Sequence, residues 1–102
     1  METVEEKITF RDWDLVDYLN TKEDVEGILE ATLEENDPAL LVAVLGDIAR
    51  SKGMAQIAKD LNLARESLYR SLSQDGNPSF STVVKVLDNL GFQLSVKQKV
   101  PA

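Results

Sequence analysis

The 102-residue chain contains neither cysteine nor histidine. The absence of cysteine excludes disulfides and zinc-thiolate sites, and it suits a reducing cytoplasm. The absence of histidine removes the commonest general base, and together the two absences remove the commonest metal ligands and the most reactive nucleophile. Only carboxylates, hydroxyls and lysines remain for chemistry. We therefore expect a protein that is not an enzyme and that binds no metal or other cofactor.

Long apolar runs are also missing. No stretch approaches the roughly 18 to 20 apolar residues of a membrane span, and the N-terminal METVEEK lacks the basic start and apolar stretch of a signal peptide. The sequence therefore predicts a cytoplasmic protein without membrane contact. A chain with 43% hydrophobic and 28% charged residues is typical of one small globular domain. Such a domain buries only about two thirds of its unfolded surface, so pairing into a homodimer would add stability.

Acidic and basic side chains are unevenly divided along the chain. Residues 1–49 hold 14 acidic and 3 basic side chains, a net charge of -11, whereas residues 50–72 hold 5 basic and 2 acidic ones, a net charge of +3. Residues 73–102 add a net charge of +1, which gives the total of -7. This asymmetry favours two different partners over one uniform surface, although charge on amphipathic helices is most often a solvated face.

Residues that start and stop helices predict five of them between residues 22 and 90. Thr21 and Asp24 form a capping box. Asp37 followed by Pro38 suits a second helix start, and Gly53 suits a helix end. The expected helices cover residues 22–35, 38–52, 54–61, 64–73 and 80–90, and residues 14–19 add one or two helical turns.

Apolar spacing predicts which helical faces are buried. In the helix over residues 22–35 the buried stripe should consist of Val25, Ile28, Leu29 and Leu33. The helix over residues 38–52 is almost continuously apolar and should be packed on most sides. Two short segments, residues 7–10 (KITF) and 92–98 (FQLSVKQ), alternate as strands do. A lone strand is not stable, so the second must pair with the first or with its counterpart in a second copy.

Residues 56–72, QIAKDLNLARESLYRSL, have the pattern of a helix-turn-helix, in which two short helices cross steeply around a tight turn. Ala58 supplies the small residue where the helices touch. Asn62 occupies the turn position where glycine is commonest, and Leu63 should fill the turn. The residues expected to face the core are Ile57, Leu61, Leu68 and Leu72. The same spacing also fits two amphipathic helices that simply close a small α-helical core.

The second of these helices would present polar side chains to DNA. Arginine can bond a guanine edge in two places, glutamate can accept from a cytosine amino group, and tyrosine can touch a sugar, a phosphate or a thymine methyl group. The expected base-contacting residues are Ala64, Arg65, Glu66, Ser67, Tyr69 and Arg70. Phosphate contacts are expected from helix N-terminal amides near Met54 and Ser79 and from Gln56, Lys59, Ser73 and Asn77. Each of these residues also fits an ordinary capping or surface role, and that role is the favoured one for Ser73 and Ser79.

Carboxylates of the helix over residues 22–35 lie outside its apolar stripe and are free to face a basic partner. They are Glu23, Asp24, Glu26, Glu30, Glu34 and Glu35. A solvated helix face explains the same pattern.

Three phrases, ARSKGM, ESLYRSLS and DGNPSFSTVVKVL, carry a family resemblance. With the upstream DLVDYLNTKEDVEGILEATLEENDP they make residues 13–96 resemble the addiction-module antidote proteins, the HigA-like antitoxins and DNA-binding prophage proteins related to the Xre and Cro repressors. Asn62 and Ala64 depart from the glycine and the serine or threonine usual in that family. The turn and the cap of the recognition helix should therefore be less stable.

The resemblance implies an antitoxin of a type II toxin-antitoxin module. Such a protein is a dimeric repressor that binds a palindromic operator in double-stranded DNA near its own promoter, and it neutralises a RelE/ParE-type, HigB-like toxin encoded beside it. Toxins of that type are usually basic, so the acidic helix is the expected toxin-binding surface. Two alternatives stay open: a stand-alone prophage or host regulator without a toxin, and a protein-interaction module that lost DNA binding.

The expected fold class is therefore mainly all-α, a five- to six-helix Cro/lambda-repressor-like helix-turn-helix domain with a short C-terminal β-strand. The whole chain, residues 1–102, forms one domain in this prediction. Acidic leader helices cover residues 1–37, the helix-turn-helix core covers residues 38–91, and the strand covers residues 92–98.

Overall fold

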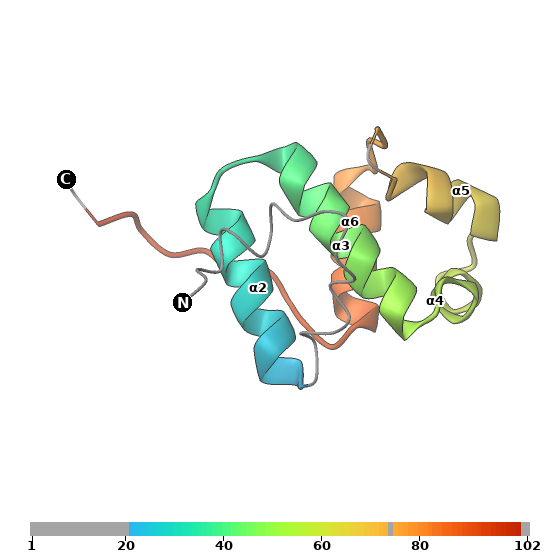
Figure 1. Ribbon diagram of the computed structural model, residues 1–102, viewed down its shortest axis with the longest axis horizontal. Coiled ribbons are helices and arrows are strands. Elements are labelled where there is room, and N and C mark those ends of the chain that lie inside the picture. Colours follow the sequence, from blue (N-terminus) through green and yellow to red (C-terminus); the bar gives the residue numbers. More distant parts are fainter. Residues whose placement is uncertain (1–20, 74, 101–102) are drawn as a thin grey trace, which may run out of the picture.

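A computed structural model describes residues 21–73 and 75–100 of the protein. Within these residues it contains five helices and no strand: α2 (Lys22–Glu34), α3 (Pro38–Lys52), α4 (Met54–Asp60), α5 (Arg65–Ser71) and α6 (Phe80–Asn89) (Figure 1). The mainly α-helical class is confirmed. The expectations for residues 7–10 and 14–19 lie outside the described part of the chain. Among the described helices, none has the length and apolar character needed to span a bilayer.

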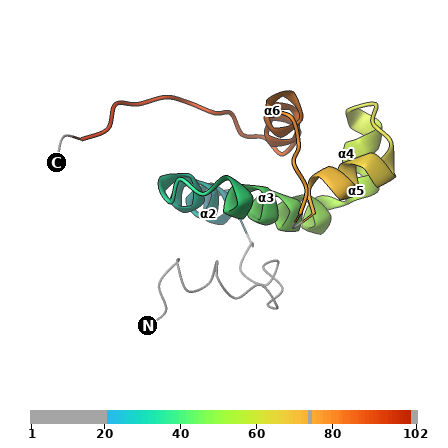
Figure 2. The same ribbon diagram turned by 90° about the horizontal axis from the view of Figure 1, so that it is seen from above.

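The first two helices pack side by side as a helical hairpin, as both views show (Figures 1 and 2). The predicted capping box closes α2, since the Thr21 hydroxyl accepts from the Asp24 N–H at 3.1 Å and the Asp24 carboxylate accepts from the Thr21 N–H at 3.2 Å. Asp37 caps α3 by accepting from the Leu40 N–H at 3.2 Å. These bonds satisfy amides that a helix start leaves without partners.

The core is built around α3, as its continuous apolar sequence predicted. Leu45 and Ile48 of α3 are almost fully buried against Leu68, Leu72 and Val86, which come from α5, its C-cap and α6. This cluster joins the described helices into one body, so side chains far apart in the sequence determine where each helix lies.

One buried position of α2 differs from the prediction. Leu33 is 44% exposed, and Thr32 is buried in its place. The Thr32 hydroxyl donates to the Ile28 carbonyl at 2.7 Å, so the buried oxygen has a partner within its own helix. Because α2 packs chiefly on α3, its buried stripe follows the i, i+3, i+4 and i+7 positions from Val25 and stops short of Leu33.

Residues 92–100 form an extended segment, here called the C-terminal arm, and not the strand predicted over residues 92–98. Gly91, with φ at 94°, ends α6, and the Phe92 N–H donates back to the Leu87 carbonyl at 2.9 Å. The arm then passes α2 and extends away from the helices (Figures 1 and 2). No described segment pairs with it, and a strand forms only where a neighbour completes its hydrogen bonds.

Candidate nucleic-acid interface

Two short helices, α4 and α5, pack against each other around the turn at residues 61–64. Figure 1 shows α4 almost end-on while α5 runs across the view, so the two helices cross steeply. Asn62 has φ at 56°, the Asn62 N–H donates to the Lys59 carbonyl, and the Leu63 N–H donates to the Ala58 carbonyl at 2.8 Å. This is the hydrogen-bond pattern with which glycine commonly ends helices, so asparagine fulfils that role here.

The side chain of Leu63 was expected to fill this turn, and that expectation is wrong. Leu63 is 37% exposed, and its backbone N–H makes the contact that closes the turn. The small contact is made by Ala58, which is buried as predicted. Ile57 is buried and Leu61 is partly buried against the core.

The position of α5 is fixed by its inner face and by one backbone contact. Leu68 and Leu72, at 1% and 0% exposure, hold the helix on the core as their spacing predicted. At its C-terminal end the Leu72 carbonyl lies so close to α3 that a Cβ on Gly46 would meet its oxygen at 2.3 Å. Only glycine permits this approach. Sequence reasoning missed Gly46, although a glycine inside a helix, which costs up to about 1 kcal/mol relative to alanine, was a usable signal.

The outer face of α5 bears an open hollow of about 890 Å³. Its lining consists of the six side chains expected to contact bases: Ala64, Arg65, Glu66, Ser67, Tyr69 and Arg70. All six are exposed. The Arg65 guanidinium lies 5.4 Å from the centre of the Tyr69 ring, a cation-π distance that holds the arginine along the helix. The arrangement offers two cations, one carboxylate and a phenol to a single ligand surface.

The four side chains expected to contact phosphates lie outside this hollow. Lys59 and Asn77 are exposed, the Gln56 amide donates to Asp60 at 2.8 Å, and the Ser73 hydroxyl donates to the Arg70 carbonyl at 2.8 Å. Ser79 caps α6 by accepting from the Thr82 N–H, while Met54 is buried at the start of α4, where no side chain supplies a cap.

Asp60 connects α4 to α6 and was not singled out from the sequence. Its carboxylate accepts from the Asn89 amide at 3.1 Å and from Gln56 on its own helix. These two bonds, the one from Asn89 first, hold the pKa of Asp60 below its ordinary value. The residue therefore stays charged and limits the orientations open to the Gln56 side chain.

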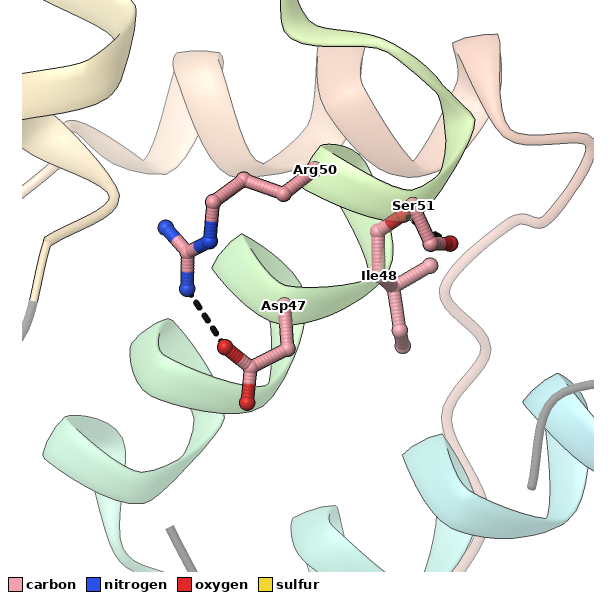
Figure 3. A network of polar contacts seen from close by, with 4 residues as sticks. All are labelled: Asp47, Ile48, Arg50 and Ser51. Atoms are coloured by element: carbon pink, nitrogen blue, oxygen red, sulfur yellow. Dashed lines mark hydrogen bonds and ion pairs between the residues drawn. The ribbon is translucent and has the colours of Figure 1, made fainter. Parts of the chain in front are cut away.

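The positive charge near α5 is smaller than the sequence count indicated. Arg50 forms an ion pair with Asp47 one turn earlier on α3, as Figure 3 shows, beside the bond from the Ser51 hydroxyl to the Ile48 carbonyl. The charge count over residues 50–72 did not include Asp47, which lies just before that range. Residues 47–72 hold five cations and three carboxylates, so their net charge is +2. Base contacts would thus have to supply more of any DNA affinity than long-range attraction.

The helix α2, which carries the acidic side chains, lies on one side of α3 and α5 lies on the other (Figures 1 and 2). All six carboxylates singled out from the sequence are exposed: Glu23, Asp24, Glu26, Glu30, Glu34 and Glu35. Asp24 also completes the capping box, so it has a structural task as well. The structure therefore separates the acidic face from the hollow on α5.

Comparison with known proteins gives two matches. A family described as "Probable addiction module antidote protein" matches residues 9–98. A relative from Haemophilus influenzae, described as an uncharacterized protein, is 42% identical over 88 residues, which cover 86% of this chain and 91% of the relative. No solved structure shows a significant match to the chain.

Proposed function

Because the chain belongs to the family of probable addiction module antidote proteins, we propose that it neutralises a RelE/ParE-type, HigB-like toxin and represses its own operon. An antidote requires a toxin partner in general, and the finer assignments rest on the two faces described above. In this proposal α4 and α5 are a helix-turn-helix, and α5 is the recognition helix. The protein acts without catalysing a reaction.

The observation that carries the DNA-binding part is the hollow on α5. Six exposed polar or small side chains surround one ligand surface on a helix whose inner face is fully packed. A helix of this kind fits a DNA major groove, where Arg65 and Arg70 would each bond a guanine edge and Glu66 would accept from a cytosine amino group. Tyr69 would contact sugar, phosphate or a thymine methyl group.

Phosphate contacts would orient the recognition helix. Gln56 and Lys59 from α4, with Ser73 and Asn77 from the loop after α5, lie outside the hollow and would bond the DNA backbone. With little net positive charge in this region, non-specific binding should be weak. Two copies are therefore needed for useful affinity, and the operator should be an inverted repeat with half-sites about 10 to 10.5 base pairs apart, or a multiple of that distance.

The toxin-binding part rests on the exposed carboxylates of α2. They form a negative face away from α5, which complements a basic partner and speeds encounter with it. Because the two faces lie apart, one copy could hold toxin and operator at the same time.

The DNA-binding part is tested by titrating the upstream promoter with the full chain and with Arg65→Ala. Wild type should protect an inverted repeat, and the variant should lose that preference while keeping its fold. Protection that does not depend on Arg65 or Arg70 would show that α5 is not the recognition helix.

The toxin-binding part is tested with the purified product of the neighbouring gene. Its association rate should fall steeply with added salt for wild type and less steeply for a variant with Glu23, Glu34 and Glu35 changed to glutamine, since such rim charges act mainly on association. Operator affinity of this variant should not fall. Toxin kinetics identical to those of wild type would leave these carboxylates as a solvated face.

A further inference from the structure

A groove of about 760 Å³ runs between α2 and the C-terminal arm. Apolar side chains from α2, α3, α6 and the arm line it, among them Leu29, Leu33, Leu41, Leu87 and Phe92. Leu33, the α2 residue that the core leaves 44% exposed, faces this groove. Carboxylates of α2, including Glu26 and Glu30, lie along its edge. Two lysines, Lys22 and Lys97 of the same chain, also line the groove, against the four carboxylates of Glu23, Glu26, Glu30 and Glu34. The groove is thus an apolar channel whose border has a net negative charge.

The arm carries the features that such a channel would accept. Side chains of an extended segment alternate between two faces, and every second residue of the arm is apolar at three positions, Leu94, Val96 and Val100. Val96 is 99% exposed and Val100 is 90% exposed, so the described residues leave the outer part of the apolar face of the arm uncovered, while Leu94 is 38% exposed. The opposite face bears Lys97 and Lys99, and the arm has no acidic residue.

We propose that the arm of a second copy of this chain occupies the groove, antiparallel to the arm of the first copy. The apolar side chains of the incoming arm lie on the groove floor, and its lysines face Glu26 and Glu30. A two-fold axis repeats the contact, so each copy gives one arm and accepts one. This inference gives the homodimer of the proposed function its interface.

Three physical arguments favour a second copy over another occupant. Both halves of the contact are present on one chain, with matching apolar surfaces and opposite charges. Two paired arms form a ribbon that rests on a helix, which is the support that a two-stranded sheet needs. The pairing also explains why the alternating sequence of residues 92–98 forms no strand in a single chain.

The arrangement leaves room for a toxin. Glu23 lies at the start of α2, and Glu34 and Glu35 lie at its end. Glu23 and Glu34 also line the groove, whereas Glu35 does not. The lysines of the arm pair with Glu26 and Glu30 in the middle of the helix, so Glu23, Glu34 and Glu35 keep their charge unpaired by Lys97 and Lys99 in this arrangement.

Charge exchange tests the interface with the full chain alone, without DNA or toxin. One variant carries Lys97→Glu and Lys99→Glu, and a second carries Glu26→Lys and Glu30→Lys. Each alone should raise the dimer dissociation constant on the order of tenfold or more in sedimentation equilibrium, because four attractive pairs in the dimer become repulsive. Mixed in equal amounts, the two variants should form heterodimers about as tightly as wild type, since both grooves then hold an arm of opposite charge.

The control variant, Lys52→Glu with Lys85→Glu, changes the net charge equally but away from the groove, and it should dimerise like wild type. Circular dichroism melting shows that each variant folds. A monomeric wild type at tens of micromolar, or a dimer indifferent to both reversals, would overturn the proposal. Amide hydrogen exchange tests the interface without a variant. The backbone amides of residues 93–100 should exchange more slowly as the protein concentration rises. Protection gained only when the neighbouring gene product is added would assign the groove to that partner instead.

Because sedimentation and the concentration dependence of amide exchange are measured on the chain alone, without DNA or toxin, the interface can fail while the proposed function stands, and the reverse also holds.

Discussion

The two helices that carry the proposed partner-binding faces, α2 and α5, differ in what stabilises them. α2 has 13 residues and is closed by a capping box, whereas α5 has 7 residues and its N-cap, Ala64, makes no side-chain bond. Helices as short as α5 are unstable alone, so α5 exists because Leu68 and Leu72 hold it on the core. The acidic face can therefore change with little effect on folding, while the candidate DNA-binding face depends directly on core packing.

The largest effect should come from removing the packing under α5. Leu72→Ala should lower the free energy of unfolding by about 2 to 5 kcal/mol, because it opens a cavity at a fully buried site. Leu63→Ala, at an exposed position of the same unit, should cost about 0.5 kcal/mol or less. Urea denaturation measures both. Equal losses from the two variants would show that α5 does not depend on its inner face.

A methyl group added to each of two helical glycines should have opposite effects. Gly46→Ala should destabilise by about 1 to 3 kcal/mol, since its Cβ would meet the Leu72 carbonyl. Gly27→Ala in α2 has nothing within 4 Å and should stabilise by about 0.5 to 1 kcal/mol. Both values come from denaturation midpoints. A neutral Gly46→Ala would mean that α3 and the end of α5 can separate freely.

Operator binding should respond to α5 and not to α2. Arg65→Ala should lose about 1 to 3 kcal/mol against the cognate site, since it removes the side chain proposed to bond a guanine edge in two places, while unfolding is unchanged. Changing Glu23, Glu34 and Glu35 to glutamine should not weaken the operator complex. Fluorescence anisotropy at one fixed salt concentration measures both variants. Weaker DNA binding by the glutamine variant would place α2 against DNA and remove the separation of the two faces.

Removing the N-cap side chain of α2 and adding one to α5 should change the free energy of unfolding by similar amounts in opposite directions. Thr21→Ala removes a side-chain acceptor from α2 and should cost about 1 kcal/mol. Ala64→Ser supplies one to α5, whose N-cap already has extended φ and ψ of -68° and 133°, and it should gain about as much. Thermal melting compares them. No gain from Ala64→Ser would mean that another group already serves these amides.

The smallest effect should come from Asp60 and pH. Its pKa is lowered in the folded protein, so the carboxylate contributes stability above the unfolded pKa of about 3.9, and this contribution is lost as the pH falls through the folded pKa. The Asp60→Asn variant has no carboxylate at this position and therefore lacks this pH-dependent contribution to stability. The stability difference between wild type and variant, measured with urea, should therefore be constant above about pH 5 and shrink below pH 4. If the stability difference between wild type and Asp60→Asn grows as the pH falls, the pKa of Asp60 is raised and not lowered in the folded protein.

Features encoded by neighbouring residues were predictable from the sequence. The capping box at Thr21, the start at Asp37 and the stop at Gly53 involve residues within one helical turn, and all three are found. The buried leucines of α5 followed from their spacing alone. The same spacing grouped six side chains that line one hollow.

Features that depend on contacts between distant residues were missed. The burial of Thr32 is decided by how α2 packs on α3, and the need for glycine at position 46 is decided by the carbonyl of Leu72. Asp60 gains its role from Asn89, which lies 29 residues later. The arm has the alternation of a strand, yet no pattern within one segment supplies the neighbour that a strand requires.

Under the proposed function, the backbone contact between Gly46 and Leu72 also bears on how this protein could acquire a new DNA target sequence. The contact is made by the main chain, so it places α5 without reference to the side chains on the outer surface of that helix. Residues 65, 66, 69 and 70 could then be replaced as a set without moving the helix they stand on. Specificity would diverge between related chains by exchanging surface residues, while position 46 stays glycine in every one that keeps this geometry.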